Sequence, residues 1–386
     1  MTTTAEVTPP VPVPAPAGPV HDHRGSWIPT GGMIATRFME LRKRRGLMIA
    51  LVLVNIGIPT IFLLVRLLAH AFDPKSYGPA GGYSIYSGLV AGVMYVFGFI
   101  VAATLGCTAS SVDLTEGMFR HLVVTGRSRL ALYFARIPAG LAIIVPLVAI
   151  GFTIVCAVCV FAAPTTINYD GVNVPAGLSR AGFEAWAGDH ADVVLCNLPG
   201  ASPQNLPCGP NGQFVTPQGA GAPGQPSPAM LKAFAISNAA QDYPGYASIF
   251  RVPSDGLMIR SGLWIELEAL IGFTVGLGLA SLLGQRTVPV ILMIVLEIVL
   301  TPLFSRARIA HLSNLQRAIV GVATAHLEPG ALPLAFGGGN GGGGPGGQSV
   351  QSLLLPESRT VAVCVIIAWL VGWTLIGAWR MMTRDA

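Results

Sequence analysis

Charge is what this chain most conspicuously lacks. Asp, Glu, Lys and Arg make up only 11% of its 386 residues, and hydrophobic residues make up 52%. Soluble domains carry about 25% charged residues. The mean hydropathy of +0.63 points the same way. Together these values exclude an ordinary soluble domain and predict a membrane protein.

The motifs of nucleotide, metal and hydrolytic chemistry are missing as well. A Walker A loop needs Gly-Lys-Ser/Thr, so that backbone amides and the lysine hold the phosphates. None of the three lysines, Lys43, Lys75 and Lys232, follows a glycine. The chain also has no H-E-x-x-H, no paired C-x-x-C and no G-x-S-x-G. We therefore expect no catalytic residue, no metal ion and no cofactor on this chain.

The N-terminal region has no apolar core of the kind that a signal peptide requires. Residues 1–30 are rich in Pro, Ala and Thr. Such a segment cannot bury enough apolar surface to fold alone. We interpret it as a disordered cytoplasmic tail.

What the chain does have is long apolar runs, and about 20 such residues span the hydrocarbon core as a helix. Six runs qualify, at 47–68, 86–110, 135–163, 260–283, 287–305 and 360–380. The predicted fold is an all-α membrane protein with six transmembrane helices. We divide it into an interfacial helix with three spans (31–163), an extracytoplasmic insert (164–258) and three further spans (259–386).

Basic residues predict the orientation, because cytoplasmic loops are enriched in Lys and Arg. They occur before the first run, between the second and third, between the fourth and fifth and after the last, at Arg42, Lys43, Arg44, Arg45, Arg120, Arg127, Arg129, Arg136, Arg286, Arg380 and Arg384. This alternation places both termini in the cytoplasm. It also accounts for the net charge of +5 without nucleic-acid binding. Abundant Ala, Gly, Pro and Arg with little Lys indicate a GC-rich bacterial genome, and hence a bacterial plasma membrane.

The residues before the first run predict an amphipathic helix. Ile34, Phe38 and Leu41 share one helical face, and basic residues such as Arg37 cover much of the rest. Such a helix lies along the inner leaflet with its apolar side down. The simpler alternative is a plain basic anchor for the first span.

Two segments are predicted to lie outside the cell. The insert contains Cys196 and Cys208, which either form a disulfide in an oxidising compartment or remain free thiols. The second segment is amphipathic from Arg306 to His326, consistent with a helix that lies in the interface or dips partly into the membrane, and a glycine-rich linker (337–347) follows it.

Charged residues within the spans are costly and often functional. Glu297 lies in the middle of the fifth run, where a polar contact in a substrate path and a structural pair are equally reasonable. Glu266, Glu268 and Arg66 lie nearer to water, which favours structural roles.

The segment Asp113–Arg136, between the second and third runs, concentrates acids and arginines. Its pattern of Glu116-Gly117, Arg120, Leu122 and Ser128-Arg129 resembles the segment E-x-G-T-x-R-x-L-x-x-x-P-x-S-R of ABC-2-type exporter permeases. Met118 replaces the usual threonine, and Gly126 stands where proline is common. The order of elements over about residues 33–163 and 260–384 is similar to that family too, whereas the long insert is a departure from it.

The resemblance implies a mechanism. Two permease halves, identical or different, would pair around a central path, and two separate ATPase subunits, which carry ATP and Mg²⁺, would dock on the cytoplasmic face. Coupling residues would then include Glu116, Gly117, Arg120, Arg127 and Arg129. The cargo would be a drug, a lipid or a glycan.

Two other functions stay open. An ion-coupled secondary transporter would need a buried ionisable relay, for which Glu297 is the candidate. A membrane scaffold would bind a cell-envelope partner through residues 164–258. A membrane-embedded enzyme is disfavoured because the spans contain no nucleophile, metal cluster or acid/base pair.

Overall fold

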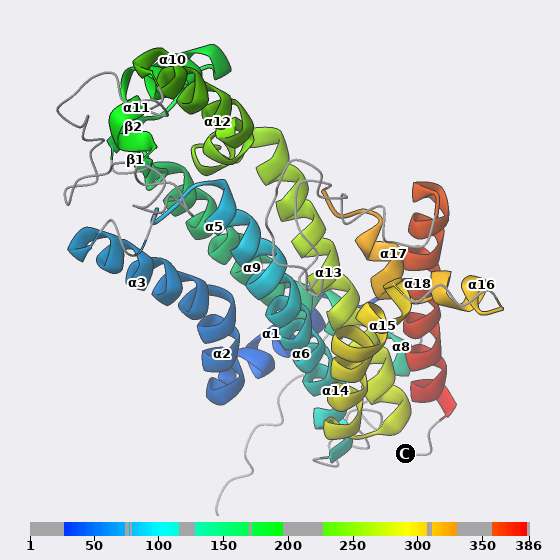
Figure 1. Ribbon diagram of the computed structural model, residues 1–386. Coiled ribbons are helices and arrows are strands. Elements are labelled where there is room, and N and C mark those ends of the chain that lie inside the picture. Colours follow the sequence, from blue (N-terminus) through cyan, green and yellow to red (C-terminus); the bar gives the residue numbers. More distant parts are fainter. Residues whose placement is uncertain are drawn as a thin grey trace, which may run out of the picture.

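A computed structural model describes residues 27–73, 77, 79–115, 128–169, 172–195, 227–306, 311–329 and 357–383. These residues are mostly helical (Figure 1). Residues 1–26 of the predicted N-terminal tail, the pair Cys196 and Cys208, and the glycine-rich linker fall outside the described residues.

Five described helical stretches are long and apolar enough to cross a membrane. They are Arg45–Phe72, Tyr83–Ser111, Arg129–Phe161, Asp255–Leu283 and Arg359–Thr383. The chain is therefore a multi-pass, predominantly helical membrane protein, as the composition predicts. The remaining run forms α14 (Thr287–Ile294), a π-helix η3 (Val295–Leu300) and α15 (Thr301–Arg306), in which the apolar helix Thr287–Leu300 is shorter than the other five.

The bundle is organised around α13 (Asp255–Leu283), which packs against α6 (Tyr95–Thr115), α9 (Arg136–Phe161) and α18 (Arg359–Thr383). In Figure 1, α13 runs through the middle of the molecule with α18 beside it. Small residues allow this close approach. A Cβ atom on Gly276 would lie 2.6 Å from the carbonyl oxygen of Ala103 in α6.

Polar contacts join the same two helices. The hydroxyls of Ser110 on α6 and Ser281 on α13 are 2.6 Å apart, and Cys107 Sγ donates to the carbonyl of Gly276 at 3.4 Å. Among helices in lipid, tight packing and interhelical hydrogen bonds take the place of a hydrophobic driving force. The α6–α13 pair uses both.

In the part of the chain that the structure describes, three π-helices interrupt the helices around this centre. The first, η1 (Leu53–Gly57), lies between α2 (Arg45–Val52) and α3 (Ile58–Phe72). The second, η2 (Leu89–Met94), lies between α5 (Tyr83–Gly88) and α6, and the third is η3. Such bulges are rare and frequently mark functional sites.

The insert forms a small folded unit at the upper left of Figure 1. Strands β1 (Thr166–Tyr169) and β2 (Val172–Pro175) pair antiparallel, next to α10 (Arg180–Asp189), α11 (Ala191–Val194) and α12 (Pro228–Ile249). Phe183 stacks on Tyr246 with ring centroids 4.2 Å apart. The Tyr246 hydroxyl donates to the carbonyl of Pro175 and so ties α12 to the hairpin.

The segment after α15 folds as two short helices, α16 (Ser313–Arg317) and α17 (Val320–Ala325), rather than one amphipathic helix. All six residues of α17 are buried. A Cβ atom on Gly321 would collide with the Thr301 side chain of α15. This segment therefore enters the bundle.

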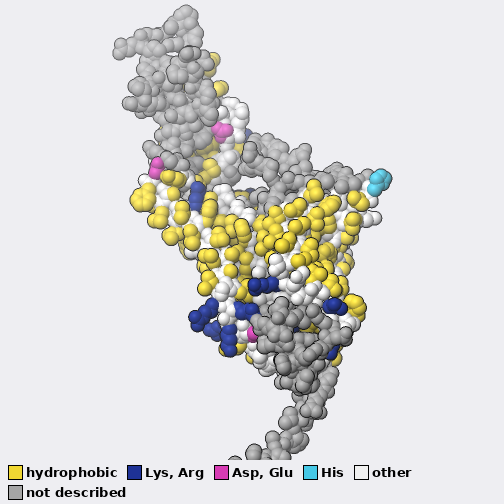
Figure 2. Space-filling model, turned by 90° about the horizontal axis from the view of Figure 1, so that it is seen from below, with side chains coloured by type: hydrophobic (Ala, Val, Ile, Leu, Met, Phe, Trp, Pro, Cys, Tyr) yellow, Lys and Arg dark blue, Asp and Glu magenta, His cyan; other side chains and the backbone are white. Residues whose placement is uncertain are grey.

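The surface shows the expected division between apolar and basic regions. Figure 2 shows hydrophobic side chains over the middle of one face, with Lys and Arg side chains gathered along one border. The basic border, as we call it, is the end of the bundle that carries Arg42, Lys43, Arg44, Arg45, Arg286 and Arg380. Exposed residues such as Ile61, Leu64 and Val65 on α3 are suited to contact with lipid.

We expect Gly276→Ala to destabilise the bundle, because the new methyl group would overlap the carbonyl of Ala103. Overpacking of this kind costs about 1–3 kcal/mol. Gly88→Ala is the matched control, since a Cβ atom there meets nothing within 4 Å. The measurement is the midpoint of thermal unfolding in detergent; equal midpoints for the two variants would contradict the assigned packing.

Candidate functional site

The amphipathic helix predicted before the first span is α1 (Gly31–Lys43). Its buried residues are Met33, Arg37 and Leu41, whereas Ile34 and Phe38 are partly buried. The guanidinium of Arg37 pairs with the Glu40 carboxylate at 2.7 Å. Because Arg37 faces inward and finds an acidic partner, α1 presents a more polar inner face than the spacing of its apolar residues suggests.

The start of α1 packs on α8 (Arg129–Phe134), the short helix that follows the segment between the second and third predicted spans, and the rest of its inner face packs mainly on α9. Met33 forms one buried apolar cluster with Ala131, Leu132 and Ala135, and Ile34 packs against it. The two elements singled out by the family resemblance are therefore in direct contact.

Two arginines connect this contact to the spanning helices. Arg129 donates from Nη1 to the carbonyl of Met382, at the end of α18, at 3.1 Å. Arg136 is buried and donates to the carbonyl of Ser110 on α6 at 3.4 Å. Since Ser110 also meets Ser281, the α1–α8 contact is continuous with α6, α13 and α18. The other predicted coupling residues, Glu116, Gly117, Arg120 and Arg127, lie outside the described residues.

A second polar site lies inside the bundle, around Glu297. This residue is fully buried within η3, and its Oε1 accepts a hydrogen bond from the Tyr95 hydroxyl. Tyr95 begins α6 directly after η2, and its ring stacks on Trp264 of α13 with centroids 4.9 Å apart. The start of α6, the central helix α13 and η3 thus come together around Glu297 and Tyr95.

Glu268 of α13 lies close enough to Glu297 to interact electrostatically, and it hydrogen-bonds to Thr324 of α17. It is 1% exposed, although its position in the sequence suggests proximity to water. The reason is that α17 covers it: the Trp264 indole donates to the carbonyl of Thr324 at 3.1 Å. Glu266 is only half-buried and does not join this group.

Glu328 lies just after α17. Together with Glu268 and Glu297 it forms a cluster of three buried carboxyls. It interacts electrostatically with Glu268, Tyr95 and Tyr83 of α5. One carboxylate oxygen on each of Glu268, Glu297 and Glu328 has no hydrogen-bond partner among the described residues. Ionised carboxylates without partners are costly in a low-dielectric interior. These three carboxyls are therefore suited to hold protons.

The sequence identifies Glu297 and Glu268 as charged residues within apolar runs, but it does not identify Tyr95 and Glu328 as their neighbours. Tyr95 and Glu328 carry no local signal, because neither a tyrosine within an apolar run nor a lone glutamate in a loop is unusual. The proline that follows Glu328 and the apolar residues of α17 indicate a folded segment, but not its position over α13.

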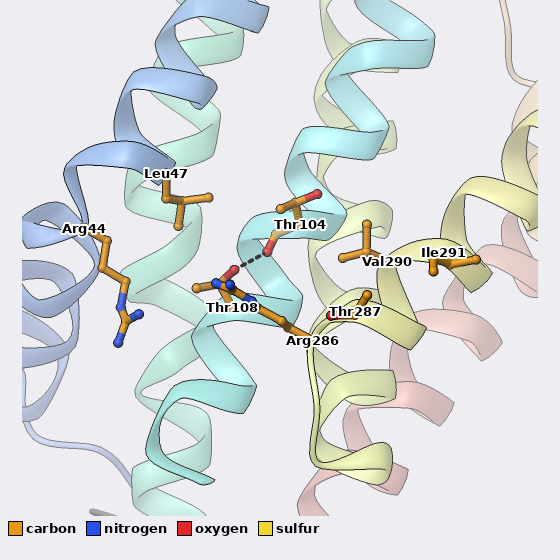
Figure 3. Close-up of a pocket in the computed structure, with 8 residues that line it drawn as sticks. All are labelled: Arg44, Leu47, Thr104, Thr108, Arg286, Thr287, Val290 and Ile291. Atoms are coloured by element: carbon orange, nitrogen blue, oxygen red, sulfur yellow. Dashed lines mark hydrogen bonds between the residues drawn. The ribbon is translucent and has the colours of Figure 1, made fainter. Parts of the chain in front are cut away.

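A cavity of about 370 Å³ opens near the basic border (Figure 3). Residues from α2, α6 and α14 and from the two chain segments that precede α2 and α14 form its walls: Arg44, Leu47, Thr104, Thr108, Arg286, Thr287, Val290 and Ile291. No single motif in the sequence marks it, because its walls come from three separated segments.

The described residues contain no group of three or more His, Cys, Asp or Glu side chains arranged to hold a metal ion. Cys107, Cys156, Cys159 and Cys364 are free thiols. Comparison with protein-family models, curated proteins and solved structures finds no match for this chain. Its function is therefore inferred from the chemistry of the sites themselves.

Burial raises the pKa of the Glu328 carboxyl to about 8. The folded protein then holds a proton that the unfolded chain has released, so this residue stabilises the fold at low pH. We expect that contribution to be lost as pH rises from about 4.5 to about 8, by up to about 1.4 kcal/mol per pH unit. Glu328→Gln should flatten the pH dependence of thermal unfolding in this window. A wild-type slope retained in the variant would show that Glu328 is not its source.

Proposed function

We propose that this chain is the permease subunit of an ABC-2-type exporter. The observation that carries the proposal is the direct packing of α1 on α8 at the basic border. A subunit that hydrolyses ATP elsewhere needs a receiving surface of this kind, joined to the spanning helices. Here α8 connects to α18 through Arg129 and to α9 by chain continuity.

The contacts beyond α8 support a route for motion. Arg136 joins the start of α9 to α6, and the Ser110–Ser281 contact joins α6 to α13. A displacement of α8 would therefore be transmitted to the central helix pair rather than absorbed in a loop. Buried contacts of this type switch between discrete arrangements because packed interiors deform little.

On this proposal the membrane crossings number six, with α14, η3 and α15 as the fifth. Both termini are cytoplasmic, and the membrane is the bacterial plasma membrane. ATP and Mg²⁺ bind to separate ATPase subunits at the basic border, and a second permease half completes the path. The exported cargo is a drug, a lipid or a glycan.

The first experiment is purification of the tagged chain in mild detergent, followed by mass spectrometry of what accompanies it. We expect a soluble subunit with a Walker A loop in stoichiometric amounts. Its reproducible absence from a folded, intact preparation would remove the basis of the proposal.

The coupling assignment has its own test. Combined charge reversal, Glu116→Arg with Arg120→Glu, should abolish substrate-stimulated ATP hydrolysis by the partner while the chain still inserts in the membrane. The matched control reverses the exposed pair Arg180→Glu with Glu184→Arg, whose side chains are 2.9 Å apart on α10 in the insert. The control should retain stimulation, because an exposed pair contributes little to stability. Unchanged activity in the first variant would contradict the assignment.

The cluster of buried carboxyls around Glu297 favours a second candidate function, an ion-coupled secondary transporter. Buried carboxyls near the middle of spanning helices are typical of proton relays. If this candidate holds, transport survives ATP depletion, stops with an uncoupler and is lost in Glu297→Gln, which keeps an acceptor for Tyr95 but not the titrating group. The exporter proposal expects the opposite response to ATP depletion.

A further inference from the structure

The cavity at the basic border differs in chemical character from the cluster of buried carboxyls inside the bundle. Its volume of about 370 Å³ is within the range of about 300–1,000 Å³ that is typical of small-molecule sites. Three helical segments that are distant in sequence form it: α2 supplies Leu47, α6 supplies Thr104 and Thr108, and α14 supplies Val290 and Ile291.

One end of the cavity is positively charged. Arg44 lies between α1 and α2, and Arg286 is the residue from which α14 begins. Among the eight described residues of the walls none is acidic. The first turn of α14 also faces the cavity through Thr287, and no side chain caps its amides. A helix N-terminus flanked by two guanidinium groups attracts anions.

The hydroxyl groups of Thr104 and Thr108 do not supply hydrogen-bond donors to the cavity, because their protons are already donated within α6. Thr108 Oγ1 donates to the carbonyl of Thr104, and Thr104 Oγ1 donates to the carbonyl of Ile100, each at 2.8 Å. Their hydroxyl oxygens therefore offer only acceptor lone pairs to the cavity. Figure 3 shows the Arg286 side chain extending toward Thr108. The hydrogen-bond donors for an anion come from the arginine side chains and from the α14 backbone.

The rest of the wall is apolar. Leu47 and Val290 face the cavity, and Ile291 is 54% exposed on the outer surface of α14. Exposed hydrophobic residues continue along the same helix at Leu292, Val295 and Val299. The cavity is therefore open on a surface suited to hydrocarbon, with its charge at the basic border.

We propose that this cavity binds an anionic amphiphile, with its phosphate or carboxylate headgroup between Arg44 and Arg286 and its hydrocarbon chain along Leu47, Val290 and Ile291. The ligand enters from the membrane leaflet at the basic border. That this amphiphile is also the exported cargo rests on the proposed function; the binding itself does not.

The test uses the full purified chain alone, so that failure of the ATPase partnership does not affect it. Delipidated protein in neutral detergent is titrated with dioleoyl phosphatidic acid, and bound lipid is counted by native mass spectrometry. Dioleoyl phosphatidylcholine tests the need for net negative charge, and inorganic phosphate serves as a competitor. The decisive variant is Arg44→Gln with Arg286→Gln. The matched control, Arg42→Gln with Arg45→Gln, removes two exposed charges from the same border without touching the cavity.

We expect saturable binding of phosphatidic acid, weakened at least about tenfold in the cavity variant and within about twofold of wild type in the control. Phosphatidylcholine and excess inorganic phosphate should not displace it. Equal loss in both variants would show general attraction to the basic border and overturn the site. Displacement by inorganic phosphate would show that a soluble anion suffices and would overturn the assignment of an amphiphile.

Val290→Trp, which fills the cavity without changing charge, should also reduce binding. Full binding in this variant would place the ligand elsewhere.

Discussion

The close approach of the α6 and α13 backbones is the constraint on which the rest of this structure depends. Glycines on α13 allow carbonyl groups of α6 to lie where a side chain would otherwise stand. In a lipid environment such contacts provide the attraction that the hydrophobic effect does not. The same approach brings Tyr95 onto Trp264 and Ser110 onto Ser281, so both polar sites are anchored to one helix pair.

The buried carboxyls show what this packing permits and what it costs. Glu297 and Glu268 come from different helices and become neighbours because η3 and α13 meet beneath α17. Tyr95 and Thr324 satisfy part of their hydrogen-bonding capacity, and one oxygen on each carboxyl has no described partner. A protein that retains such groups at the centre of a bundle accepts a loss of stability, which is common at functional sites.

The two ends of the molecule are chemically distinct. At one end an aromatic core holds the insert together through Phe183 and Tyr246. At the other, arginines surround α1, α8 and the cavity between α2, α6 and α14. The elements that receive motion in the proposed exporter and the cavity that receives the proposed ligand therefore share the basic border. A ligand held between α2 and α14 could influence the same helices that α8 moves.

The sequence by itself determined the membrane class, most of the spanning segments, the helix before the first span and the presence of Glu297 within an apolar run, because hydropathy, period and intramembrane charge are local properties. The length of the run at 287–305 did not reveal the π-helix within it. Only the tertiary structure decided that α1 packs on α8, that α17 buries Glu268 and that Glu328 and Tyr95 face the same interior. It also decided that Arg44 and Arg286, 242 positions apart in the numbering (286 − 44), line one cavity. The physical reason is that contacts between helices in lipid depend on which small residues allow backbones to meet, and that pairing is a property of the whole bundle.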